Sequence, residues 1–121
     1  MQLAYLHDFC LTLPGAEDTL PFGPDTLVYK VMNKMFLITG VDDTVVSINV
    51  KCDPTKAIEL REQYSYVQPG YHMNKKHWNT VLMDGTVNVT LLKQWITDSY
   101  NLVVTSLTKS QQTELAKLYK Q

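Results

Sequence analysis

The chain has 121 residues, of which 45% are apolar and 19% are charged, which suits one globular domain over residues 1–121 and is short for two. No apolar run approaches the roughly 20 residues that cross a bilayer, and residues 1–13 lack the basic start of a secretory signal. We therefore expect a soluble, cytoplasmic, monomeric protein with no membrane partner.

The net charge of −1 argues against a strongly electrostatic nucleic-acid binder, because affinity for a polyanion comes largely from lysine and arginine. The charge is unevenly distributed along the chain. Residues 1–50 contain two basic and six acidic residues, a balance of −4, whereas residues 51–121 contain nine basic and six acidic residues, a balance of +3. Any basic surface is therefore expected to be local and to come mainly from the second half.

The first half predicts one helix followed by three strands. Apolar residues at helical spacing predict an amphipathic helix from Leu3 to Leu13, ended by Pro14 and Gly15. Residues 16–25, rich in proline, glycine and acids, predict an ordered loop. Residues 27–31, 35–39 and 45–51 predict strands, and their short connections predict an antiparallel meander. In the third strand the alternation predicts that Val46, Ile48 and Val50 face the helices, while Asn49 and Lys51 point away from the core.

The second half predicts a helix, a fourth strand and two more helices. Asp53 and Pro54 form a strong helix start, and this helix should reach about residue 64. Its inner side is assigned to Ala57, Ile58, Leu60, Arg61 and Tyr64. Residues 78–83 suit a fourth strand. A stripe at 3.6-residue spacing predicts a long helix, and its residues are Leu92, Trp95, Ile96, Ser99, Leu102, Val103 and Ser106. Thr108 and Gln111 fit a capping box that opens a terminal helix, with Leu115 and Leu118 inward. The predicted fold class is α+β, an antiparallel sheet of a meander plus a fourth strand packed against N-terminal, middle and C-terminal helices.

Residues 68–80 are the most chemically loaded stretch, because two histidines, two lysines, two aromatic residues and a Pro-Gly turn fall within them. His72 and His77 are spaced for metal, but a site needs three or four ligands and no third one is near, so we expect no metal and no other cofactor. Cys52 precedes a helix N-terminus, which favours a reactive thiol, although a buried structural cysteine is the commoner case; both cysteines are expected to be reduced. Without a visible nucleophile and base pair, the sequence does not indicate an enzyme.

Contact with a polyanion fits this stretch better. Lys75 and Lys76 supply charge, and Tyr71 and Trp78 supply rings that stack on bases. The hydrogen-bond donors are His72, Asn74 and Asn79. A purely structural reading stays open, in which Trp78 anchors the fourth strand and the lysines are a solvated turn.

Three runs of residues resemble the MmcQ/YjbR family of small bacterial proteins. They are Asn49-Val50-Lys51-Cys52-Asp53-Pro54, then Pro69-Gly70-Tyr71-His72-Met73-Asn74-Lys75-Lys76-His77-Trp78-Asn79, then Asp98-Ser99-Tyr100-Asn101-Leu102-Val103. The resemblance covers nearly the whole chain. It implies a two-layer fold of the frataxin/CyaY type and a DNA-binding role through two β-hairpins. The residues implied for DNA contact are Lys51, His72, Asn74, Lys75, Lys76, His77 and Trp78, with Lys30 and Lys34 on the first hairpin.

The leading hypothesis is thus a weak, sequence-independent DNA binder that reads phosphate through Lys51, Lys75 and Lys76. About three phosphate contacts predict a log–log salt slope near −3. A rival hypothesis is a pocket protein or small enzyme that holds a small anionic ligand between Tyr71, His72, His77 and Trp78. A third is a protein-interaction adaptor, for which an exposed apolar patch near residues 68–80 would be the sign.

Overall fold

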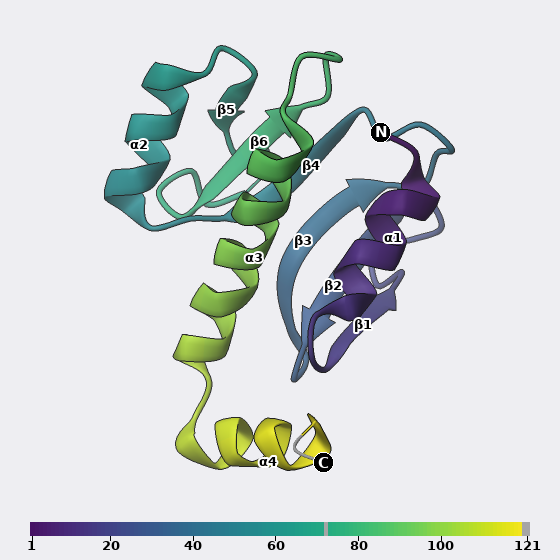
Figure 1. The fold of residues 1–121 in the computed structure, drawn as a ribbon, viewed down its shortest axis with the longest axis vertical. Coiled ribbons are helices and arrows are strands. Elements are labelled where there is room, and N and C mark those ends of the chain that lie inside the picture. The colour runs from purple at the N-terminus through teal and green to yellow at the C-terminus, as the bar shows by residue number, and fades with distance from the viewer. Residues whose placement is uncertain (72, 120–121) are drawn as a thin grey trace.

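The computed structural model describes residues 1–71 and 73–119 (Figure 1). Within them the chain forms four helices and six strands. The helices are α1 (Leu3–Thr12), α2 (Pro54–Gln63), α3 (Val89–Ser106) and α4 (Lys109–Tyr119). The strands are β1 (Ala16–Thr19), β2 (Thr26–Val31), β3 (Lys34–Gly40), β4 (Ser47–Lys51), β5 (Val67–Pro69) and β6 (Trp78–Leu82). The α+β prediction is confirmed.

All six strands belong to one antiparallel sheet with the order β1-β2-β3-β4-β6-β5. The predicted meander is its centre, formed by β2, β3 and β4. A two-residue turn joins β2 to β3, and its residues Met32 and Asn33 both have positive φ angles, of 47° and 67°. That backbone is the one whose twist matches a tight hairpin.

The helices α1, α2 and α3 cover the same face of the sheet, which gives two layers, whereas α4 extends beyond them at the lower end of Figure 1. The core lies between the layers. Its largest fully buried side chains include Tyr29 and Phe36 from the sheet and Leu92 and Ile96 from α3. Most of the 3.6-residue stripe of α3 therefore packs on the sheet as predicted. Its last residue, Ser106, is exposed, and Leu102 is only partly buried. None of the described helices is both long enough and apolar enough to cross a membrane.

Two edge strands were missed in the sequence. The region 16–25 was read as a loop, but its first four residues form β1, which carries the exposed acids Glu17 and Asp18 and so lacks the apolar alternation that marks an inner strand. Charged residues of this kind protect a sheet edge from pairing with another chain. The second missed strand, β5, has only three residues and ends in Pro69, which only an edge strand tolerates.

Three apolar residues assigned to the core are exposed, so those predictions were wrong. Val46 is 70% exposed because it precedes β4, and the neighbouring Val45 is buried in its place. Ile58 is 54% exposed because α2 turns Ala57 and Leu60 toward the sheet, and the two residues between them point away from it. Leu118 is 60% exposed, while Leu115, one turn earlier on α4, is buried.

The predicted helix starts are confirmed in detail. The Asp53 carboxylate accepts from the backbone N–H groups of Thr55 and Lys56, which caps α2. At the start of α4, the Thr108 hydroxyl accepts from the Gln111 N–H at 3.1 Å while the Gln111 side chain accepts from the Thr108 N–H, also at 3.1 Å. This reciprocal pair is a complete capping box.

Candidate functional site

Strand register gathers the predicted lysines at one end of the sheet. Lys34 begins β3 opposite the end of β2, and Lys51 ends β4 opposite Trp78, the first residue of β6. The connection between β5 and β6, residues 70–77, leaves the sheet at this same end. We call this region the lysine end and define it by Lys30, Lys34, Lys51, Lys75 and Lys76.

The opposite end of the sheet is acidic. Asp25 precedes β2, Asp42 and Asp43 lie between β3 and β4, and Asp84 follows β6. All four are exposed. Antiparallel pairing thus places the lysines at one end of the strands and these four aspartates at the other end. Two basic residues at the lysine end have acidic neighbours, because Lys30 pairs with Glu17 on β1, and the exposed Asp53 follows Lys51 by two residues and lines the same pocket.

Arg61 of α2 holds the β5–β6 connection in place. Its Nε donates to the Asn79 side-chain oxygen at 2.6 Å, and its Nη2 donates to the backbone oxygens of Lys75 and Trp78. Asn79 is only 1% exposed, so this guanidinium satisfies a buried amide as well as two loop carbonyls. The sequence predicts Arg61 on the inner side of α2, but only the tertiary structure shows that its side chain binds the β5–β6 connection.

Gly70 allows the connection to fold tightly against β6. It is buried, and a Cβ atom at this position would lie 2.8 Å from the Trp78 Cβ and 2.9 Å from the Trp78 carbonyl oxygen. Both gaps are shorter than real Cβ contacts allow, so a side chain at residue 70 would push the connection away from the strand.

The predicted contact residues of this segment differ in accessibility. Lys75, Lys76 and Asn74 are exposed, and the Asn74 side chain accepts from the Lys76 N–H at 3.0 Å, which shapes the turn. His77 is half-buried and its carbonyl oxygen accepts from the Cys52 N–H. Trp78 is only 8% exposed, so little of its ring is available for stacking. His72 lies outside the described residues.

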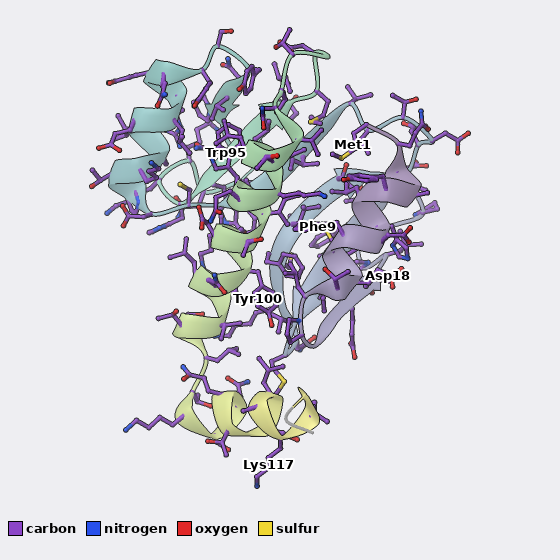
Figure 2. All side chains as sticks on the ribbon, viewed as in Figure 1. Met1, Phe9, Asp18, Trp95, Tyr100 and Lys117 are labelled. Carbon is purple, nitrogen blue, oxygen red and sulfur yellow. The ribbon has the colours of Figure 1, made fainter. Side chains whose placement is uncertain are left out.

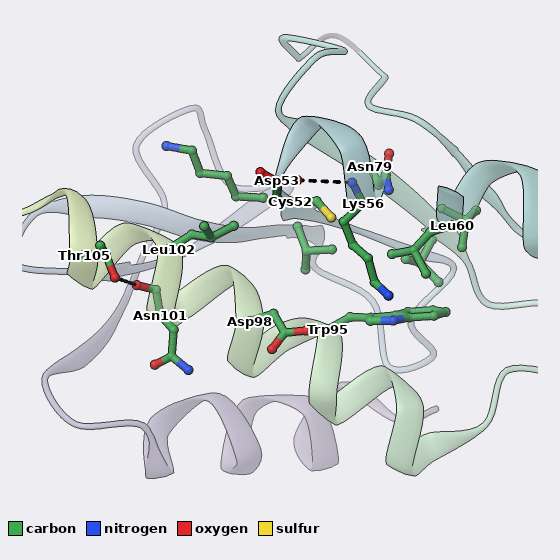
Figure 3. Close-up of a pocket in the computed structure, with 14 residues that line it drawn as sticks. Cys52, Asp53, Lys56, Leu60, Asn79, Trp95, Asp98, Asn101, Leu102 and Thr105 are labelled. Carbon is green, nitrogen blue, oxygen red and sulfur yellow. Dashed lines mark hydrogen bonds between the residues drawn. The ribbon is translucent and has the colours of Figure 1, made fainter. Parts of the chain in front are cut away.

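A pocket of about 290 Å³ opens between α2 and α3, above β4, β5 and β6 (Figure 3). Its apolar walls come from Val50, Leu60, Val67, Val81 and Trp95, and its polar lining includes Cys52, Lys56, Asn79, Asp98 and Asn101. Lys51 belongs to both regions, because it ends β4 and also lines this pocket. The residues that line this pocket form no short motif in the sequence.

Cys52 lies in this pocket as a neutral thiol. Burial raises its pKa above the ordinary value of 9.0, and the nearby carboxylates of Asp53 and Asp98 raise it further against the smaller opposing effects of Lys56 and Arg61. The raised pKa therefore favours the structural cysteine that the sequence indicates as the commoner case over a thiol activated by the helix N-terminus. The Asp53 carboxylate caps the N-terminus of α2, so the positive end of the helix dipole interacts with this carboxylate and not with the thiol.

This pocket differs from the ligand pocket that the sequence predicted in residues 71–78. Its lining includes none of Tyr71, His77 and Trp78. Tyr71 instead lines a concavity on the open face of the sheet, together with Phe22, Asn49 and other residues. The two aromatic residues of 68–80 thus differ, because Trp78 is buried whereas Tyr71 is exposed on the open face of the sheet, in the same connection as Lys75 and Lys76.

A family model and two curated proteins match this chain over most of its length. The YjbR family model matches residues 11–102. The uncharacterized protein YbdF of Escherichia coli O157:H7 is 42% identical over 102 residues, which cover 84% of each chain. The uncharacterized protein YjbR of Escherichia coli K12 is 29% identical over 118 residues, 98% of this chain and all of the relative.

Two solved structures show a similar fold. The crystal structure of a Deinococcus radiodurans protein with a DUF419 domain is 40% identical, has a TM-score of 0.86, and matches over 96% of this chain and 89% of its own. A Pseudomonas syringae crystal structure is 27% identical, has a TM-score of 0.71, and matches over 84% of this chain and 98% of its own. Because the family model matches residues 11–102 and YbdF is 42% identical over 84% of each chain, the protein belongs to the YjbR family.

Proposed function

We propose that the lysine end binds nucleic acid weakly and without sequence preference, through phosphate contacts. The observation that supports this most is the separation of charge along the sheet, with lysines at one end and Asp25, Asp42, Asp43 and Asp84 at the other. A phosphate backbone approaching the lysine end meets positive charge while the acidic end stays distant. The net charge of −1 therefore understates the local attraction.

Four lysines carry the proposed contacts. Lys34, Lys75 and Lys76 are exposed and Lys51 is half-buried, whereas the cross-strand Glu17 offsets the charge of Lys30. Four phosphate contacts correspond to a log–log salt slope of about −3.6 for duplex DNA. This slope is slightly steeper than three contacts would give, because the fold adds Lys34.

Tyr71 gives the proposed site a preference for unpaired bases. It is 72% exposed and lies in the same connection as Lys75 and Lys76. Stacking on an exposed ring contributes roughly 1–3 kcal/mol per base and requires a base that is not paired. Single-stranded DNA should therefore bind more tightly than the matching duplex.

The test is a fluorescence anisotropy titration of labelled single-stranded and duplex DNA at several salt concentrations. Reversing two charges, with Lys75→Glu and Lys76→Glu together, should weaken binding at least tenfold at low salt and flatten the salt slope. The matched control is Lys109→Glu with Lys117→Glu on α4, which changes the net charge equally but away from the sheet. Absence of binding at low salt, or equal losses in both variants, would refute the proposal.

A protein-interaction role is the second candidate, and one observation favours it. The exposed aromatic residues Tyr71 and Phe22 line one concavity with Met35 and Met73, and this apolar surface beside residues 68–80 supports an adaptor role. Tyr71→Ser distinguishes the two functions when single-stranded DNA affinity is measured beside recovery of protein partners. A variant that loses a stoichiometric protein partner while keeping its DNA affinity would favour the adaptor.

A further inference from the structure

The pocket between α2 and α3 has the construction of a small-molecule site. Its volume of about 290 Å³ lies near the lower end of ligand pockets, which typically measure about 300–1,000 Å³. It combines an apolar floor with a few polar side chains at its sides, the usual arrangement where shape gives affinity and polar groups give orientation. The volume restricts an occupant to about one or two rings with a short substituent.

The aromatic wall favours a flat ring. Trp95 is held by Tyr64, whose ring meets it edge-on with centroids 5.3 Å apart, and by Tyr66 at 6.2 Å. Figure 3 shows the Trp95 indole lying across the pocket, with Leu60 and the end of Lys56 on the side that faces it. Trp95 and Leu60 are each 6% exposed, so a ring in the pocket would contact only the part of the indole and of the leucine side chain that lines the cavity.

Opposite charges stand on the two helices that flank the pocket. Lys56 projects from α2 and Asp98 from α3, and both act on the pKa of Cys52 between them. No hydrogen bond joins these two described side chains across the pocket in Figure 3. Asp98 accepts a hydrogen bond from Gln94 at 2.8 Å on its own helix. An occupant with one anionic and one cationic group would satisfy Lys56 and Asp98 together.

We infer that this pocket binds a small aromatic zwitterion, with its ring against Trp95, its carboxylate toward Lys56 and its ammonium group toward Asp98. The chemistry is that of a free aromatic amino acid or a close derivative. This inference does not depend on nucleic-acid binding. It also differs from the anionic ligand expected at Tyr71, His72, His77 and Trp78, both in the residues involved and in the charge of the ligand.

The test uses four probes that separate ring and charges. Tryptophan has the ring and both charges, tryptamine has the ring and the ammonium, indole-3-propionate has the ring and the carboxylate, and alanine has both charges without the ring. Binding is read from the two indole N–H signals of the ¹⁵N-labelled protein, assigned by Trp78→Phe. Trp95 reports the pocket, and Trp78 is the internal control because it does not line it.

Tryptophan should shift the Trp95 signal at millimolar concentration and leave the Trp78 signal in place. Each single-charge probe should bind roughly two- to fivefold more weakly, the range expected for loss of one exposed ion pair. Alanine should produce no shift of Trp95. The inference fails if no ring-bearing probe moves the Trp95 signal at about 10 mM, a concentration that detects affinities weaker than 1 mM, or if alanine matches tryptophan.

Two substitutions assign the charges. Asp98→Asn should weaken tryptophan and tryptamine while leaving indole-3-propionate unchanged, and Lys56→Gln should weaken tryptophan and indole-3-propionate while leaving tryptamine unchanged. Glu59→Gln on the exposed side of α2 is the matched control and should change none of them. Equal effects of both pocket substitutions on all three ring probes would refute the assigned orientation.

A blocking variant tests the location of the site. Leu102 lines the pocket and is only partly buried, so Leu102→Trp fills the cavity from its edge with little disturbance of the core. It should abolish the tryptophan-induced shift of Trp95 while DNA affinity stays as it was. Tryptophan binding that survives this variant would place the site elsewhere and overturn the inference.

Discussion

The lysine end and the α2–α3 pocket lie side by side, yet the sequence reveals them very differently. Two of the five lysines of the lysine end, Lys75 and Lys76, come from one contiguous stretch in which charge and aromatic residues are concentrated, and strand register adds the other three. The pocket takes its lining from five separate elements and the β4–α2 junction, and its polar residues are unremarkable one by one. A surface for an extended charged partner can thus be read from local composition, whereas a cavity for a compact ligand depends on which distant residues meet.

The two regions also differ in how they are held. The β5–β6 connection is fixed to its strand by the Arg61 side chain and by the absence of a side chain at Gly70. The pocket is fixed through α3, whose Ser99 is fully buried against the sheet. The Ser99 hydroxyl donates to the Phe36 carbonyl at 2.5 Å and accepts from the Lys51 N–H at 2.8 Å. It bridges β3 and β4 just beyond their last paired residues, Leu37 and Val50.

The largest effect is expected at Ser99, because it supports both regions. Ser99→Ala removes the partner of a buried N–H and of a buried carbonyl, each at a cost of roughly 1–3 kcal/mol. The free energy of unfolding, measured by urea denaturation, should fall by about 2–4 kcal/mol. Ser106→Ala on the same helix is the control, because that hydroxyl is exposed and bonds only within the helix. Equal losses in both variants would show that the bridge contributes nothing specific.

Gly70→Ala should separate the two regions. The added methyl group meets Trp78 at distances that force the connection outward, which should cost about 1–3 kcal/mol in stability. DNA affinity should weaken because Lys75 and Lys76 move, while the pocket keeps its ligand. Gly40→Ala is the matched control, since its nearest contact would be an ordinary 3.9 Å. A pocket ligand lost together with DNA would mean that the two regions are coupled.

The smallest effect concerns Cys52, and it tests the pocket alone. Since burial raises the pKa of this thiol, its thiolate fraction at neutral pH is lower than that of a free cysteine. Its reaction with a neutral disulfide reagent should be slow at pH 7 and should still be rising with pH beyond the ordinary value of 9.0, where the rate of a free cysteine levels off. Mass spectrometry identifies the labelled residue, and the urea-unfolded chain supplies the reference rate. Labelling at pH 7 as fast as in the unfolded chain would contradict a buried neutral thiol.

Modification of Cys52 also sharpens the distinction between the two regions. The attached group would occupy the pocket, so the Trp95 signal should no longer respond to tryptophan, whereas DNA affinity should be unchanged. A drop in DNA affinity after labelling would indicate that Lys51, which lines the pocket and belongs to the lysine end, couples them.

Local signals predicted the elements well where a short range of sequence specifies the backbone. The capping residues Asp53, Thr108 and Gln111 were identified because a cap is satisfied within three residues. The edge strands β1 and β5 were not predicted because hydrogen bonding to a neighbouring strand defines them, while their sequences lack alternating apolar and polar residues. Ile58 and Leu118 were misplaced because an apolar residue on a short helix faces the core only if another element covers it.

By itself, the sequence determined the α+β class, the meander and the α3 stripe, because periodicity, capping and turn chemistry are local properties of the chain, and the resemblance of three runs of residues indicated the family. The tertiary structure alone decided that Lys34 and Lys51 join Lys75 and Lys76 at one end of the sheet, that Trp78 is buried, and that Lys56 faces Asp98 across a cavity. The physical reason is that charge proximity, burial and cavity shape depend on strand register and helix packing, which join residues far apart in the chain.

The same contrast is visible within α3. The spacing of apolar residues predicts which side of α3 is buried, but only the fold shows which residues that side contacts. Ser99 was placed inward by the 3.6-residue period, yet its role depends on Phe36 lying 63 residues away and on Lys51 lying 48 residues away. Figure 2 shows Trp95 and Tyr100 from this helix directed to different parts of the molecule. Periodicity fixes the direction of a side chain, and packing supplies its partner.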